Sequence, residues 1–168
     1  MKFLGFLLFF CVSLWGFEAD YKSFSSDFTQ IVSNKNSKIS YKGKLIITQN
    51  KAFWSYEEPT QKQIYIKNQN ITIVEPDLEQ VILTKLEKVP NLTQIFKNAK
   101  QNKQGLYEAN YEGVRYIVKL ENDEVQSISY QDDLENEVSI ILSKQKRNFA
   151  VDENIFEAKY PKSYDILR

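Results

Sequence analysis

Histidine is absent from this chain of 168 residues, and the single cysteine, Cys11, lies in its first apolar run. Histidine is the commonest general base and the commonest metal ligand, so its absence removes the usual basis of both kinds of chemistry. Glycine-rich phosphate loops are also missing, since only Gly43, Gly105 and Gly113 lie beyond residue 16. The composition therefore predicts no enzyme, no metal site and no cofactor.

An excess of either charge is missing as well. Lys plus Arg and Asp plus Glu are balanced at 22 each, and the two signs are interspersed along the chain. Nucleic-acid binding depends on a basic face that releases counterions from phosphates. We therefore expect no nucleic-acid partner.

The first residues have the pattern of a secretory signal peptide. Lys2 precedes an apolar run that extends to Leu14, and the small residue Gly16 follows. This run is shorter than the roughly 20 residues that a membrane-spanning helix requires. We expect a signal peptide at residues 1–16, with cleavage after Gly16 or after Ala19. Residues 17–168 then form a single domain, because roughly 150 residues suffice for one hydrophobic core.

Cys11 raises the alternative of a lipid anchor, because some bacterial leaders end at a lipid-modified cysteine. Such leaders place a small residue directly before the cysteine, whereas Phe10 occupies that position here. The sequence therefore favours a cleaved leader over an anchored protein.

Hydrophobic spacing predicts a helix followed by a sheet. Residues 21–35 carry apolar side chains at intervals typical of an amphipathic helix: Tyr21, Phe24, Phe28, Ile31 and Val32. From Ile39 the period changes to two, which indicates a strand with one buried face. Further strands end at the prolines Pro59, Pro76 and Pro90, because proline cannot donate to a sheet ladder.

A short helix interrupts the strands after Pro90, where Leu92, Ile95 and Phe96 have helical spacing. Strand patterns resume from Val114, and the chain ends with a helical turn near residues 152–154 and a last strand. We predict an α+β fold in which an antiparallel sheet forms an unclosed half-barrel, and the helices cover an apolar cavity.

Acidic pairs are the remaining candidates for catalysis. Glu57 and Glu58 are adjacent, as are Asp132 and Asp133. Neighbouring residues on a strand point to opposite faces, so neither pair forms a ready dyad. The stretch DDLENE also lacks the glycine and the alternating spacing of a calcium loop. We interpret both acidic pairs as solvated turn residues.

A series of short motifs runs in order along the chain: FTQ at 28–30, Gly43, Trp54 with Pro59, VEPDLEQV at 74–81, the helical insert after Pro90, and a C-terminal group of Asn148, Val151, Asp152, Phe156 and Pro161. In this order the motifs resemble the LolA family of periplasmic outer-membrane lipoprotein carriers. This resemblance implies a carrier that binds acyl chains of lipoproteins released from the inner membrane and delivers them to the outer membrane. Acylated lipoproteins, an ABC-type releasing transporter and an outer-membrane acceptor would be its partners, the periplasm its compartment, and a monomer its state.

The expected acyl-chain cavity is lined by Phe28, Leu45, Ile47, Phe53, Trp54 and Tyr56. Its lid is the insert helix, through Leu92, Ile95 and Phe96. Since a slip of one residue reverses every side chain of a strand, either Phe53 or Trp54 could be the one that faces inward. The family's lid-latching arginine has no counterpart before Trp54, which leaves Gln49, Lys51 or no residue in that role. The alternatives to a soluble carrier are an anchored lipoprotein receptor of similar fold and an envelope enzyme acting on lipids or glycans.

Overall fold

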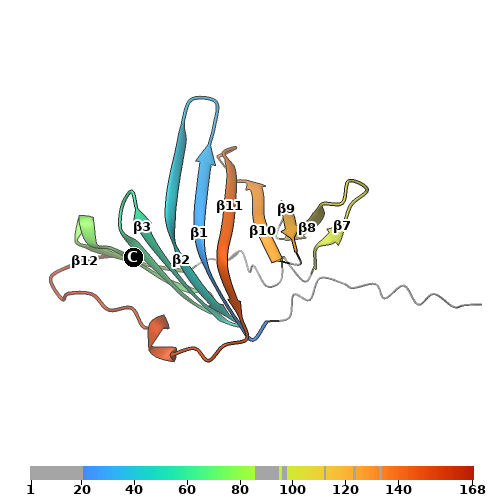
Figure 1. The fold of residues 1–168 in the computed structure, drawn as a ribbon. Helices are drawn as coiled ribbons and strands as arrows, with labels where there is room; N and C mark the ends of the chain where they lie inside the picture. The colour runs from blue at the N-terminus through green and yellow to red at the C-terminus, as the bar shows by residue number, and fades with distance from the viewer. Residues whose placement is uncertain (1–20, 86–94, 96–97, 112, 123, 133) are drawn as a thin grey trace, which may run out of the picture.

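The fold is a single twelve-stranded sheet, and its order is β12-β6-β5-β4-β3-β2-β1-β11-β10-β9-β8-β7 (Figure 1). The computed structural model describes residues 21–85, 95, 98–111, 113–122, 124–132 and 134–168. Neighbouring strands are antiparallel except β12, which pairs in parallel with β6. The bounds are β1 Ser23–Ser33, β2 Lys38–Thr48, β3 Lys51–Glu58, β4 Lys62–Lys67, β5 Asn70–Glu75, η1 Pro76–Leu78, β6 Gln80–Lys85, β7 Lys100–Gln101, β8 Tyr107–Tyr111, β9 Val114–Glu121, β10 Glu124–Gln131, β11 Glu137–Arg147, η2 Glu153–Phe156 and β12 Asp165–Leu167.

The edge strands β12 and β7 lie at opposite ends of this order, so the sheet is unclosed, as predicted for a half-barrel. The strands with clear period-two patterns are confirmed, and β3 ends directly before Pro59. The sequence patterns did not predict β7 and β8, two short strands that follow the insert along the chain.

The predicted helix at residues 21–35 is wrong, because this segment forms the central strand β1. Phe24, Phe28 and Val32 are spaced by four residues. Side chains at this interval lie on the same face of a strand as well as on the same face of a helix. Ser26 lies between the phenylalanines on the same face, and it is only 3% exposed. Its hydroxyl donates to the carbonyl of Ser143 on β11 at 2.8 Å and accepts from the Ser143 amide at 3.1 Å, so a polar residue is satisfied inside the sheet.

The insert helix after Pro90 falls mostly outside the described residues. Ile95 and Asn98 have helical backbone, and Ile95 is completely buried. Leu92 and Phe96 lie outside the described part, so a helical cover over the sheet remains a prediction.

The two faces of the sheet differ in what they pack against. We call the face that carries Phe28, Leu45 and Trp54 the inner face; it holds the larger hydrophobic core, which includes Ile95. The opposite, outer face is covered over β3–β6 by the C-terminal segment, residues 148–164 (Figure 1). That segment begins where Asn148 donates its amide to the Ser23 carbonyl at 2.9 Å, and it ends in β12.

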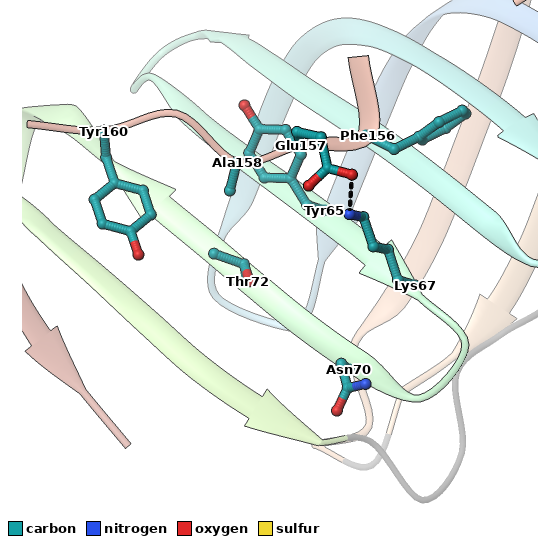
Figure 2. Close-up of a pocket in the computed structure, with 8 residues that line it drawn as sticks. All are labelled: Tyr65, Lys67, Asn70, Thr72, Phe156, Glu157, Ala158 and Tyr160. Atoms are coloured by element: carbon teal, nitrogen blue, oxygen red, sulfur yellow. Dashed lines mark hydrogen bonds and ion pairs between the residues drawn. The ribbon is translucent and has the colours of Figure 1, made fainter. Parts of the chain in front are cut away.

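The C-terminal segment is held to the outer face by burial and by ion pairs. Phe156 in η2 is fully buried, and Ala158 and Tyr164 pack against Tyr65, Val74 and Val81. Lys51 pairs with Glu153, and Lys67 with Glu157. Figure 2 shows the Lys67–Glu157 pair beside a hollow of about 190 Å³, whose wall combines Tyr65, Asn70 and Thr72 with Phe156, Glu157, Ala158 and Tyr160.

Candidate binding face

An aromatic centre lies in the middle of the inner face. The ring of Phe28 on β1 meets Trp54 and Tyr56 of β3 edge-on, with centroid distances of 5.1 Å and 5.0 Å. Edge-to-face packing at these distances is the favoured geometry of aromatic pairs. Strand β2 lies between them and contributes Gly43, whose lack of a side chain leaves room for the Phe28 ring.

Apolar residues continue from this centre across β4, β5 and β6. The register pairs Trp54 with Ile64, Ile64 with Ile73, and Ile73 with Ile82, so these side chains share the inner face. Ile66 and Ile71 form a second such row on the same face. Of these isoleucines, only Ile71 is fully buried, whereas the others are partly open to solvent: Ile64, Ile66, Ile73 and Ile82.

The other half of the inner face is closely packed. Strands β8–β11 contribute side chains with almost no exposure, and Ile95 joins the same core: Ala109, Tyr116, Val118, Val125, Ile128, Val138, Ile140 and Leu142. The inner face thus has a filled half beneath the insert residue Ile95 and a partly open half on β3–β6. An apolar ligand could use the open half without displacing this core.

A hollow of about 220 Å³ lies at the junction of β1, β2, β3 and β4 on the inner face. Its lining is Gln30, Val32, Tyr41, Tyr56, Thr60, Lys62 and Ile64. The Tyr56 hydroxyl donates to Gln30 Oε1 at 2.8 Å. Burial raises the pKa of Tyr56 well above its usual range, so the hydroxyl stays protonated and remains a donor.

Charged side chains gather on the outer face of the central strands instead. Lys144 pairs with Asp27 at 2.8 Å, and this ion pair holds the pKa of the Asp27 carboxyl below its usual value. Lys44 pairs with Glu57 at 3.0 Å. The central strands therefore separate charged side chains on the outer face from apolar side chains on the inner face.

Five of the predicted cavity residues share the inner face: Phe28, Leu45, Ile47, Trp54 and Tyr56. Phe53 does not, because it lies on the outer face with its ring centroid 5.0 Å from that of Tyr65. We therefore remove Phe53 from the candidate set. The isoleucines of β4–β6 were not proposed as cavity residues, although their period-two spacing could have suggested them.

Neither residue suggested as a replacement latch lies on the inner face. Gln49 is exposed in the turn between β2 and β3, and Lys51 points outward, where it pairs with Glu153 and lies 5.7 Å from the Phe156 ring. An inner-face arginine that sequence reasoning missed is Arg147 of β11, which is paired with Phe24. Its guanidinium carbon lies 5.0 Å from the centroid of the Tyr21 ring, a distance typical of a cation–π contact.

Three members of the acidic pairs have structural partners, and the fourth, Asp133, lies outside the described residues. Glu57 and Glu58 are exposed and pair with Lys44 and Lys42 of the neighbouring strand. Asp132 accepts the amides of Leu134 and Asn136, both at 2.9 Å, and these bonds shape the β10–β11 turn. In the described part of the chain, no cluster of His, Cys, Asp and Glu could hold a metal ion, and no helix is long and apolar enough to cross a membrane.

An unclosed sheet with charged side chains on the outer face of its central strands and a partly open apolar inner face is the arrangement expected of a protein that carries apolar ligands. Residues 19–112 match the family model described as outer membrane lipoprotein carrier protein LolA, and the chain belongs to this family. The predicted family is thereby confirmed. Because it is a family of carriers, the chain is not an enzyme.

Relatives named as lipoprotein carriers are similar in sequence to this chain over most of its length. An outer-membrane lipoprotein carrier protein of Campylobacter jejuni subsp. jejuni is 44% identical over 165 residues, which are 97% of this chain and 98% of that protein. One from Wolinella succinogenes is 31% identical over 149 residues, 87% of each chain. The solved structure of a LolA superfamily protein from Nitrosomonas europaea has a TM-score of 0.53 at 10% identity, covering 85% of this chain and 94% of that one, and it supports the fold.

Proposed function

We propose that this chain binds the acyl chains of lipoproteins on its inner face and carries them from the inner to the outer membrane. The observation that carries this proposal is the open half of the inner face, where Trp54, Ile64 and Ile73 lie side by side and partly exposed. Family membership makes the chain a lipoprotein carrier of the LolA type. The inner face supplies an apolar surface on which such cargo could be held.

The compartment and partners follow from this role. A signal peptide at residues 1–16 would deliver the chain to the periplasm, and residues 17–168 would form the carrier domain. An ABC-type transporter in the inner membrane would load the monomeric carrier, and an outer-membrane acceptor would receive the cargo. The balanced charge of the chain gives no reason to add nucleic acid to these partners.

Reversible binding requires that much of the gain from burying an acyl chain is offset. Each buried methylene contributes about 0.8 kcal/mol, so complete burial of several chains would hold the cargo too tightly for release. We assign the opposing cost to a lid formed by Leu92, Ile95 and Phe96. Ile95 is fully buried in the inner core, and exposing a side chain of this size costs about 2 kcal/mol.

Tryptophan fluorescence tests the inner-face site. Once the leader is removed, Trp54 is the only tryptophan, since the other is Trp15. A long-chain fatty acid that carries bromine at mid-chain quenches tryptophan on contact. Titrating it into the protein should quench Trp54 in a saturable manner.

The matched control exchanges the neighbouring aromatic residues, as Phe53→Trp with Trp54→Phe. The tryptophan then lies on the outer face, beside Tyr65, and should escape quenching while the unlabelled acid still binds. Equal quenching in both proteins, or none in either at saturating ligand, would contradict acyl binding on the inner face.

A further inference from the structure

The 220 Å³ hollow on the inner face differs in character from the apolar surface around it. Polar groups of Gln30, Tyr41, Tyr56, Thr60 and Lys62 line it, together with the apolar side chains of Val32 and Ile64. A hollow of about 220 Å³ with these polar groups has room for a compact polar group.

Hydrogen bonding sets the chemistry of this hollow. The Tyr56 hydroxyl donates a hydrogen bond to Gln30 Oε1 at 2.8 Å, and this bond orients the side-chain amide of Gln30. Gln30 Nε2 then remains as a donor, for which the described residues provide no acceptor. The Tyr41 ring packs edge-on against Tyr56 at 6.0 Å and brings a second hydroxyl to the same wall. Donors of this kind match carbonyl oxygen atoms.

The charge of the hollow argues against an anionic group. Lys62 is the positively charged residue in the lining of the hollow, and the Lys62 ammonium is already paired with Glu75 at 3.0 Å. Glu75 also accepts from the side-chain amide of Gln80, and these partners keep the pKa of its carboxyl below the usual value. A phosphate or a free carboxylate would therefore meet no unpaired positive charge there. A neutral head with ester or amide carbonyls fits better.

The position of the hollow connects it to the apolar surface. Tyr56 lines the hollow and also belongs to the aromatic centre, where its ring centroid lies 5.0 Å from that of Phe28. Ile64 also lines it and continues the isoleucine rows toward Ile73 and Ile82. An amphiphile could thus place its carbonyl-bearing head in the hollow while its chains extend over β3–β6.

We propose that the hollow is a subsite for the neutral head of an acylated ligand, in which Gln30, oriented by the Tyr56 hydroxyl, donates its side-chain amide to the ester carbonyls that join the chains to the head. This inference rests on the proposed carrier function, since it assumes that acyl chains occupy the inner face. It adds selectivity for esterified chains over bare hydrocarbon, which an apolar surface alone does not provide.

The test compares a lipopeptide that carries two ester-linked palmitoyl chains with its ether-linked analogue, which lacks the carbonyls. Wild-type protein should bind the ester form about tenfold more tightly, as expected for one or two net hydrogen bonds. Gln30→Met and Tyr56→Phe should each reduce this preference, and the double variant should abolish it. The readout is the ratio of the ester and ether affinities in each protein, because a change in acyl packing at these positions affects both lipopeptides alike. Circular dichroism and urea denaturation check that all three variants fold.

Tyr65→Phe is the matched control. Tyr65 makes the same type of bond, donating to Gln63 Oε1 at 2.9 Å, but on the outer face. This variant should keep the full ester preference. If wild-type protein binds both lipopeptides equally, the subsite is overturned and the carrier function stands. If it binds neither, the proposed acyl binding fails as well.

Discussion

At the scale of single residues, Gly43 determines how the aromatic centre packs. An added Cβ at this position would lie 2.0 Å from the Ser55 carbonyl oxygen and 2.8 Å from Cζ of Phe28. The Phe28 ring therefore lies against bare backbone of β2, which lets it reach Trp54 and Tyr56 at once. The backbone of β3 approaches even more closely, and the β2–β3 register shifts beside this point, between Lys42 and Gly43.

Gly43→Ala should lower the free energy of unfolding by about 3 kcal/mol, because a backbone carbonyl cannot move aside as a flexible side chain would. Urea denaturation of the mature protein measures this change. Ser40→Ala, on an exposed position of the same strand, is the control and should shift stability by no more than about 0.5 kcal/mol. Equal midpoints for the two variants would show that the close approach around Gly43 is not a constraint.

At the scale of elements, the C-terminal segment supports the strands that carry the candidate site. Strand β3 presents Trp54 to the inner face, while Phe53 and Lys51 point to the outer face. Phe156 of η2 is fully buried, with the Lys51 ammonium 5.7 Å from the centroid of its ring. One edge of the sheet is completed by the same segment when β12 pairs with β6. Packing of the C-terminal segment on the outer face thus holds in place the strands whose inner face forms the candidate binding surface.

Phe156→Ala should destabilise the protein by about 3–5 kcal/mol, the usual cost of removing a fully buried aromatic ring. Thermal unfolding followed by circular dichroism provides the measurement. The comparison variant is Leu134→Ala, since Leu134 is 82% exposed in the β10–β11 turn and its loss should change little. A Phe156→Ala protein as stable as the Leu134→Ala protein would mean that the segment is not anchored through this ring.

At the scale of the whole molecule, the sequence predicts the strands well where apolar and polar residues alternate, as in β2 and β9. It fails at β1, because side chains spaced by four satisfy both periods and only pairing with β2 and β11 decides between them. The choice between Phe53 and Trp54 also required the cross-strand register, which depends on the shift beside Gly43. The C-terminal cover of the outer face has no repeating pattern that could reveal where it packs.

The central claim is that lipoproteins are carried on the inner face, and a release assay tests it most directly. Inner-membrane vesicles that contain lipoproteins and the releasing transporter are incubated with ATP and the mature protein, and the supernatant is examined for a soluble one-to-one complex. Wild-type protein should form this complex. Ile73→Glu, which places a charge on the inner face, should not, whereas Thr72→Glu on the outer face should behave as wild type. Complex formation by Ile73→Glu at the wild-type level, or none by wild-type protein, would contradict the account.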